Sequence, residues 1–353
     1  MNNSVDLTTN IGCRVQCKFC PQDVSMSNYA IKNGSNKIEF GKPILLPYET
    51  FVKILKKIPK NVLIRFSGFS EPFLNPECIN MIKYAYDNGY QIQLYSTLVG
   101  MTVDDVDILN TIKLQKFVIH LADVEKYAKI PLALHKEILT KITSSSMKNI
   151  FFMSMGTVPD EIKNIIGMDI KASEMQDWAG NIDFGKKTER ITGPILCTMN
   201  RSKNNRDIPP IILPNGDTIL CCKDWSMDYV LGNLHDCTYN ELFESKTYHE
   251  ILKKMQSEND EILCRNCEFA LSVNKEKNLK QQFDELGINP SDEIGIKLDE
   301  LYQYYLQRSI DPEGLIFFYM QIKNGIMTYD DVEKQIMQSA EYISIPKKNI
   351  SNN

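Results

Sequence analysis

Cys13-Arg14-Val15-Gln16-Cys17-Lys18-Phe19-Cys20 is the stretch of sequence on which the interpretation of this chain depends. The cysteines have the spacing C-x3-C-x2-C and directly follow a short run, residues 5–9, that is typical of a buried strand. In a chain with ten cysteines, chance alone would produce this spacing in roughly one sequence in a hundred. Because disulfides are rare inside cells, thiols clustered this closely more often bind metal or take part in catalysis.

Composition and charge limit the class of protein. The chain has 353 residues, 43% of them hydrophobic, which is enough for one large core and a smaller appended domain. A net charge of −5 gives no electrostatic reason to expect a nucleic-acid partner. No run approaches the ~18 apolar residues of a membrane span, and residues 1–6 lack the pattern of a secretory signal. We therefore expect a soluble, cytoplasmic protein without a membrane span.

Strand and helix patterns alternate through residues 5–172. Repeated strand–helix units form parallel sheets with right-handed crossovers. We therefore expect an α/β fold, a partial (β/α)6 TIM-like barrel, over residues 1–190. The expected strands are residues 5–9, 62–67, 91–95, 117–121, 150–154 and 166–170. The expected helices lie in residues 51–58, 79–86, 104–113, 134–142 and 160–165.

The pattern changes near Gly193-Pro194. Residues 191–272 are cysteine-rich, and the Pro-Asn-Gly turn at 214–216 predicts a hairpin within a small hairpin/helix module. Residues 273–345 read as a helical C-terminal module, and residues 346–353 as a disordered tail.

Three thiolates within eight residues suit one kind of metal group. They can ligate three of the four irons of a 4Fe-4S cubane and leave the fourth iron open for chemistry. Zinc usually takes four ligands, and the nearest histidine, His120, is distant in sequence. We therefore interpret Cys13, Cys17 and Cys20 as ligands of a catalytic 4Fe-4S cluster.

With an aromatic residue, Phe19, before the last cysteine, and with its place on the first loop of a (β/α)6 chain, this motif resembles the radical SAM superfamily. The resemblance implies that S-adenosylmethionine (SAM) chelates the open iron. It further implies that an electron, delivered by a flavodoxin- or ferredoxin-type donor, cleaves SAM to methionine and a 5′-deoxyadenosyl radical. That radical would abstract hydrogen from the substrate.

Two further loops support the resemblance. Ser67-Gly68-Phe69-Ser70-Glu71-Pro72 is similar to the family's Gly-Gly-Glu-Pro loop, which implies that Gly68, Phe69, Ser70 and Glu71 hold the SAM amino group. Ser96 and Thr97 stand where the family approaches the SAM ribose, and Phe19 would lie beside the adenine. The sequence departs from the family at Phe69-Ser70, which replace two glycines, and at Leu98-Val99, which replace Asn-Gly.

A second set of four thiols lies in the cysteine-rich module. Cys197, Cys221, Cys264 and Cys267 match a fully ligated 4Fe-4S cluster or a structural zinc. The adjacent Cys222 competes with Cys221, and the Gly-x4-Cys spacing from the turn favours Cys221. The arrangement resembles the short SPASM/twitch extension of radical SAM enzymes, which implies one auxiliary 4Fe-4S cluster. Zinc remains the alternative.

The layout with one auxiliary cluster is similar to that of the aminocyclitol dehydrogenase of butirosin biosynthesis. This resemblance implies a dehydrogenase or epimerase acting on a sugar, nucleotide-sugar or cyclitol. The C-terminal module, with its Asp311-Pro312-Glu313-Gly314 turn, resembles modules appended to bacterial sugar-modifying enzymes, so a glycan-assembly partner is one hypothesis. Two alternatives remain, a peptide-modifying radical SAM/SPASM maturase and a non-catalytic metal-binding scaffold.

A general base is the remaining group that the expected chemistry needs. Oxidation of an alcohol carbon needs a proton acceptor near the mouth of the barrel. His120 and Asp123, after the fourth expected strand, and Arg65, in the second, are placed to be candidates.

Overall fold

The computed structural model has two compact units, Met1–Leu271 and Ser272–Asn353. The expected disordered tail, residues 346–353, lies outside the described residues. No helix in the described part of the chain is long and apolar enough to cross a bilayer. The structure describes residues 4–34, 38, 42–184, 188–199, 209–306, 308–339 and 342.

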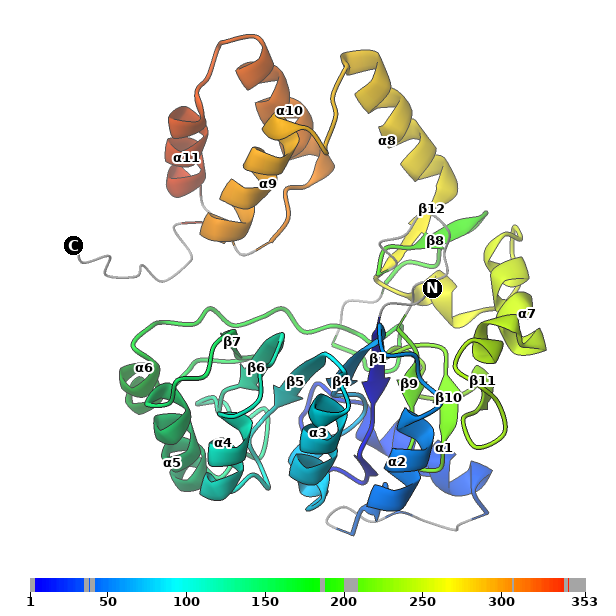
Figure 1. The fold of residues 1–353 in the computed structure, drawn as a ribbon. Coiled ribbons are helices and arrows are strands. Elements are labelled where there is room, and N and C mark those ends of the chain that lie inside the picture. The colour runs from blue at the N-terminus through cyan, green and yellow to red at the C-terminus, as the bar shows by residue number, and fades with distance from the viewer. Residues whose placement is uncertain are drawn as a thin grey trace. The chain divides into compact units, whose positions relative to one another are not determined.

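An eight-stranded sheet forms the centre of the first unit, in the order β11-β10-β9-β1-β4-β5-β6-β7 (Figure 1). Strands β1, β4, β5, β6 and β7 are parallel neighbours, as the alternating strand and helix patterns predicted. Their bounds are Ser4–Leu7, Leu63–Phe66, Ile92–Ser96, Lys116–His120 and Ile150–Met153. The predicted α/β partial-barrel fold is confirmed.

The prediction of a sixth barrel strand at residues 166–170 is wrong. Helix α6 (Asp160–Ile166) takes up Ile166, which is buried in the core cluster together with Ile162. Gly167 then ends the helix in the left-handed conformation. What remains of the strand is an isolated parallel bridge between Ser154 and Ala172. Of the apolar residues assigned to the strand, Ile166 thus belongs to the buried face of a helix instead.

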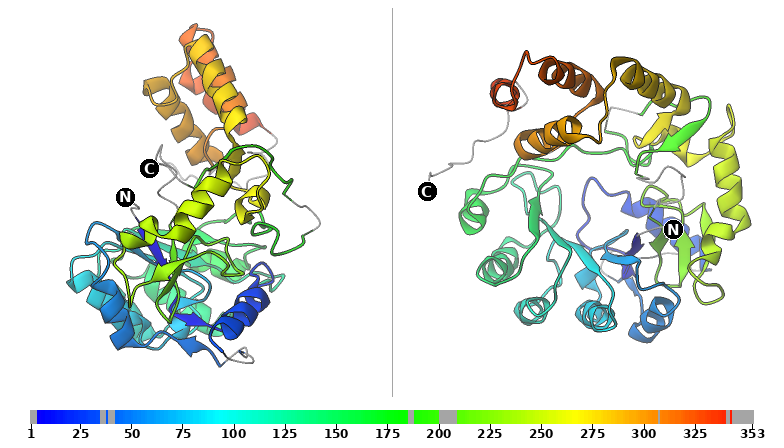
Figure 2. Two further views of the ribbon diagram at one scale, coloured as in Figure 1. Left: turned by 90° about the vertical axis from the view of Figure 1, so that its right-hand side faces the viewer. Right: turned by 45° about the horizontal axis from the view of Figure 1, so that its top comes forward.

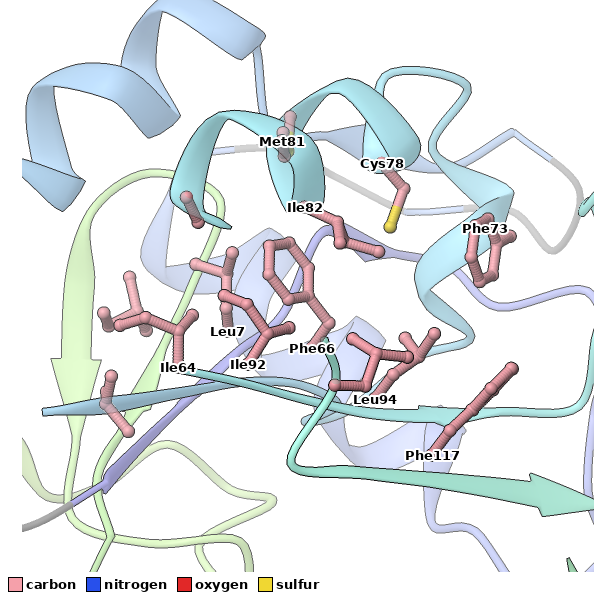
Figure 3. Close-up of a cluster of buried hydrophobic side chains, with 14 of the residues drawn as sticks. Leu7, Ile64, Phe66, Phe73, Cys78, Met81, Ile82, Ile92, Leu94 and Phe117 are labelled. Atoms are coloured by element: carbon pink, nitrogen blue, oxygen red, sulfur yellow. The ribbon is translucent and has the colours of Figure 1, made fainter. Parts of the chain in front are cut away.

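Helices cover the outer face of the parallel strands. Figure 2 shows these blue-to-green helices as an outer arc around the strands. Figure 3 shows Phe66, Ile92 and Leu94 of the sheet packed against Cys78 and Ile82 of α3. All five of these side chains belong to one buried cluster, so the sheet–helix interface forms the main core. The helices are α2 (Tyr48–Leu55), α3 (Cys78–Asp87), α4 (Val103–Leu109), α5 (Leu132–Thr143) and α6.

The cysteine-rich segment continues the same sheet. Strand β9 (Ile211–Ile212) pairs in parallel with β1, and the predicted turn leads into β10 (Asp217–Ile219), antiparallel to β9. Strand β11 (Val230–Asn233) closes this edge of the sheet. The remaining elements in the described part of this segment are β8 (Ile195–Cys197), α7 (Lys246–Met255), two short 3-10 turns (Glu241–Glu244 and Leu263–Asn266) and β12 (Ala270–Ser272), which pairs with β8.

Elements that the sequence did not indicate also lie near the first cysteines. Helix α1 (Gln22–Lys32) begins two residues after Cys20, and β2 (Asn10–Ile11) pairs with β3 (Ile44–Leu45) just before Cys13. The cysteine stretch is therefore held between a small strand pair and a helix.

The second unit is helical, as expected. Its core contains Leu298, Tyr302, Phe318 and Val332. The Asp-Pro-Glu-Gly turn begins α10, where the Asp311 carboxylate accepts a hydrogen bond of 2.8 Å from Gly314 N. The helices are α8 (Val273–Leu286), α9 (Glu293–Leu306), α10 (Pro312–Lys323) and α11 (Tyr329–Gln338).

Candidate active site

Cys13, Cys17 and Cys20 line one cavity at the carboxyl ends of the parallel strands. The loops after β4 and β5 form other parts of its wall, so the three sequence motifs singled out above meet here. Open α/β sheets place function at this end because the loops after neighbouring strands converge there. The residues fit the expected group, since three thiols beside one cavity can ligate three corners of a cubane and leave the fourth facing the cavity.

Local backbone geometry positions the three thiols. Gln16, between the first two cysteines, has a left-handed φ of 47°, and Cys20 N donates to Cys17 O at 3.0 Å. Burial raises the pKa of the Cys13 thiol to about 12. The Cys20 thiol and burial together raise the pKa of Cys17 above its ordinary value. Without metal these two thiols stay protonated, so loading of a cluster must release protons.

The loop after β4 explains why this chain can depart from the Gly-Gly-Glu-Pro pattern. Gly68 has φ of +88°, and a Cβ atom there would lie 2.2 Å from Thr8 Oγ1, so glycine is required at this position. Phe69 is buried and packs on Trp225 with ring centroids 4.3 Å apart. The Phe69 side chain, which replaces the first of the two glycines, therefore belongs to the packing of the site.

Glu71 connects the loops after β4 and β5. Its buried carboxylate accepts hydrogen bonds from Ser96 Oγ at 2.7 Å, Thr97 N at 2.5 Å and Thr97 Oγ1 at 2.6 Å. Phe73 N donates to the same carboxylate at 3.2 Å. Burial raises the pKa of Glu71, and the hydrogen bonds from Thr97 and Ser96 oppose that rise. The structure thus joins residues that the sequence assigned separately to the amino group and the ribose of SAM.

Of the three candidate proton acceptors, His120 lines the cavity. Its ring stacks on Phe19 with centroids 5.1 Å apart, and burial lowers its pKa to about 4, so it is neutral near pH 7. Asp123 Oδ1 accepts from Tyr127 N at 2.9 Å, outside the cavity wall. Arg65 forms an ion pair with Asp6 within the sheet.

Three polar atoms of the cavity wall have no protein partner among the described residues. They are Ser70 Oγ, His120 Nε2 and the indole N–H of Trp225. A buried polar group without a partner is costly, so these atoms fit a cavity that receives a polar ligand. Trp225 is a residue of the cavity wall that the sequence did not indicate, because its partners Phe69 and Trp178 are distant in the chain.

Cys197, Cys221, Cys264 and Cys267 line a second cavity. Burial raises the pKa of Cys264 to about 12 and also raises that of Cys221. Cys222 does not line this cavity, so the structure places the thiol that the turn spacing favoured beside the other three. No group of three or more His, Cys, Asp or Glu side chains within the described ranges could hold a single metal ion. Each thiol of a cubane binds a different iron, so four thiols around a cavity fit such a cluster.

Arg265, inside the Cys264–Cys267 loop, is a second residue that sequence reasoning missed. Its side chain is fully buried, and it donates to carbonyl oxygens of two surrounding stretches, residues 191–193 and 254–260. The C-x2-C corner is therefore held in place by an interior guanidinium. The accepting carbonyls are those of Ile191, Gly193, Lys254, Ser257 and Asp260, at 2.6 to 3.2 Å.

Comparison with known proteins agrees with this geometry. Residues 210–268 match the SPASM family, described as an iron-sulfur cluster-binding domain, whereas no curated protein matches the chain. The solved structure of BtrN in complex with AdoMet and 2-DOIA is 11% identical, with a TM-score of 0.50 over 77% of this chain and 94% of BtrN. Streptococcus suis SuiB bound to the precursor peptide SuiA is 12% identical, with a TM-score of 0.54 over 76% of this chain and 70% of SuiB.

The chain therefore shares the fold of these two proteins, and part of its cysteine-rich segment, residues 210–268, matches an iron-sulfur cluster-binding domain. The expected partial barrel is confirmed by this fold, and the expected SPASM-type module by the match of residues 210–268.

Proposed function

We propose that the chain is a radical SAM enzyme that abstracts hydrogen from a carbohydrate or cyclitol carbon, which it then oxidises or epimerises. The observation that carries the proposal is that Cys13, Cys17 and Cys20 share a cavity wall with Gly68, Glu71 and Ser96. AdoMet is bound in the structure of BtrN, which shares the fold, and this supports SAM as the cofactor here.

The two cavities would hold two groups with different tasks. When bound, the cluster at Cys13, Cys17 and Cys20 would supply SAM with the electron that releases the 5′-deoxyadenosyl radical, and the auxiliary cluster would accept an electron. The match of residues 210–268 to an iron-sulfur cluster-binding domain supports a cluster over zinc in the second cavity. A flavodoxin- or ferredoxin-type protein is the proposed electron donor.

The side chains of the first cavity have separable roles in this scheme. Glu71 fixes the loops after β4 and β5 against each other, so both present one geometry to SAM. Neutral His120 has a ring nitrogen without a protein partner and can take the proton lost when an alcohol carbon is oxidised. The Ser70 hydroxyl and the Trp225 indole can donate hydrogen bonds to ligand oxygens.

Coverage favours a small-molecule substrate. The chain aligns with 94% of BtrN, which was solved with 2-DOIA, but with 70% of SuiB, which was solved with its precursor peptide. Nearly a third of SuiB therefore has no counterpart in the alignment. A peptide maturase is the second candidate, and the likeness in fold to SuiB is the observation that favours it.

Anaerobic reconstitution tests the radical chemistry. Protein loaded with iron and sulfide, reduced with dithionite and given SAM should release 5′-deoxyadenosine, and Cys17→Ala should abolish the release. Cys264→Ala should impair turnover yet leave some uncoupled SAM cleavage. Cys237→Ala is the matched control, because that thiol donates to Asn233 O at 3.2 Å and lines neither cavity. Full activity of Cys17→Ala would refute the proposal, and a fully loaded protein that releases no 5′-deoxyadenosine would favour the scaffold.

Isotope transfer tests the substrate class. Panels of deuterated sugars, nucleotide-sugars and cyclitols on one side, and of peptides on the other, are incubated with SAM under the same conditions. Deuterium in 5′-deoxyadenosine from the first panel supports the proposal, whereas transfer from peptides alone would assign the chain to the maturases.

A further inference from the structure

A buried lysine lies on the wall of the auxiliary cavity. Lys223 follows Cys221 and Cys222, lines the cavity of the four auxiliary thiols, and has a side chain only 2% exposed. Its ammonium group is 2.5 Å from Glu268 Oε1 and 2.6 Å from Gln176 Oε1. A cation taken out of water to this degree is costly unless it is paired, so the chain keeps Lys223 here with dedicated partners.

Aromatic rings complete the surroundings of the ammonium group. The Lys223 nitrogen lies 4.0 Å from the centroid of the Trp178 ring and 4.7 Å from that of Phe269. Trp178 in turn donates its indole N–H to Phe19 O at 2.6 Å, next to Cys20, and lines the first cavity. One chain of contacts thus runs from the first cysteine loop to the wall of the auxiliary cavity.

The backbone that carries Trp178 is held in an uncommon conformation. Trp178 and Ala179 have φ of 54° and 57°, a left-handed conformation that side-chain-bearing residues rarely adopt. Ala179 N donates to Glu268 Oε2 at 3.1 Å, so the carboxylate that pairs with Lys223 also fixes this turn. Glu268 follows Cys267 directly, and its charge contributes to raising the pKa of that thiol, after burial.

The two charges act on the auxiliary site in opposite directions. A cluster ligated by four thiolates gains one negative charge on reduction, and nearby charges and burial set its potential. A cation on the cavity wall favours the reduced state, and an anion beside Cys267 disfavours it. The side chain of Lys223 is buried and that of Glu268 is 20% exposed, so solvent screens their charges less than it screens charges at the surface.

We propose that the Lys223–Glu268 pair sets the reduction potential of the auxiliary cluster, with Lys223 raising the potential and Glu268 limiting that rise. This inference rests on the proposed function. In the oxidation of an alcohol carbon, the substrate radical formed by hydrogen abstraction would have to lose one electron, which a cluster held by Cys197, Cys221, Cys264 and Cys267 would accept, and the hydroxyl proton, which His120 would take. The C–O bond becomes a carbonyl, so atoms and electrons balance. Lys223 thus does not touch the substrate and acts on the reaction only through the reduction potential of the cluster.

Redox titration of the auxiliary cluster alone tests the inference. In a Cys13→Ala/Cys17→Ala/Cys20→Ala background, the electron paramagnetic resonance signal of the reduced auxiliary cluster is followed against applied potential, without SAM or substrate. Lys223→Met should shift the midpoint to lower potential and Glu268→Gln to higher potential, while Lys223→Arg should stay near the parent. Lys223→Met and Glu268→Gln are also titrated in the protein with both clusters, so that the test does not depend on the folding of the triple-alanine background.

Opposite shifts distinguish charge from structural damage, because damage to the shared site would move both variants in one direction or lose the iron. Midpoints that stay unchanged, or that shift alike, in variants that keep their iron would overturn the inference and leave the proposed function standing. Wild-type protein that binds four irons rather than eight would instead remove the auxiliary cluster from the proposed function, and this inference with it.

Discussion

Replacement of Glu71 by glutamine isolates what the buried carboxylate contributes. The carboxylate is 5% exposed and accepts four hydrogen bonds, from Ser96 Oγ, Thr97 Oγ1 and the N–H groups of Phe73 and Thr97. Glutamine has the same shape but carries one acceptor oxygen and one N–H₂ donor. The hydroxyls can rotate to accept from the amide, whereas a backbone N–H cannot.

The geometry then fixes the size of the effect. If the amide oxygen faces Thr97 N, the N–H₂ group faces Phe73 N, and the opposite rotamer reverses this arrangement. Either way one buried N–H loses its partner, which costs about 1–3 kcal/mol. Relief of the carboxylate's own burial offsets part of that cost, so we expect Glu71→Gln to lower the free energy of unfolding by about 1–2 kcal/mol. Glu71→Ala leaves all four donors without this acceptor and creates a void, so it should lower the free energy of unfolding by about 3–5 kcal/mol.

Urea unfolding of the metal-free protein measures these values. The chain has two tryptophans, Trp178 and Trp225, and both lie in the first unit, so their fluorescence reports on the unit that contains Glu71. The matched control is Glu77→Gln, an exposed carboxylate that accepts from Asn80 Nδ2 at 3.0 Å and should stay within about 0.5 kcal/mol of wild type. A Glu71→Gln protein as stable as this control would refute the assigned role.

Three further substitutions probe the same unit by the same unfolding measurement. Gly68→Ala should lower the free energy of unfolding clearly more than Gly89→Ala does. Both glycines have positive φ, but only a Cβ atom at Gly68 meets a neighbour, 2.2 Å away, so equal losses would contradict this. Burial lowers the pKa of His135 from 6.5 to about 4, so the unfolded chain takes up the proton before the folded chain does. The contribution of His135 to the free energy of unfolding is therefore complete above pH 6.5 and falls by about 3 kcal/mol as the pH drops toward 4. His135→Gln should flatten that fall, and an unchanged slope would count against it. Arg265→Met should cost at least about 3 kcal/mol and reduce iron bound by the auxiliary module, because it strands several buried carbonyls; intact iron content and stability would disprove this.

Sequence patterns predicted correctly those features that depend on residues close together in the chain. Strands of alternating burial, such as β5, and helices with an apolar stripe, such as α3, formed at the expected places. The spacing of Cys13, Cys17 and Cys20 predicted that they ligate one cluster, and the structure places all three on the wall of one cavity. Short spacings restrict geometry strongly, so they can be interpreted without knowledge of the rest of the chain.

What could not be predicted depends on contacts between distant residues. Lys223 and Glu268 lie on different loops, and nothing near either one indicates that it is buried. Arg265 resembles any surface arginine in sequence, yet its partners begin at Ile191. The expected strand at residues 166–170 failed for a related reason, because the three apolar residues of so short a stretch, Ile166, Met168 and Ile170, do not distinguish a helix from a strand.

The position of β1 has a consequence for how the chain is made. Leu7 pairs with Phe66 on one side and with Ile212 on the other, so one neighbour is synthesised roughly 200 residues after β1 itself. At ~5–20 residues per second, the ribosome needs ~10–40 s to supply it, and an open strand edge in that interval can pair with other chains. Truncation before residue 211 would make that edge permanent, so we expect the N-terminal barrel expressed alone to aggregate.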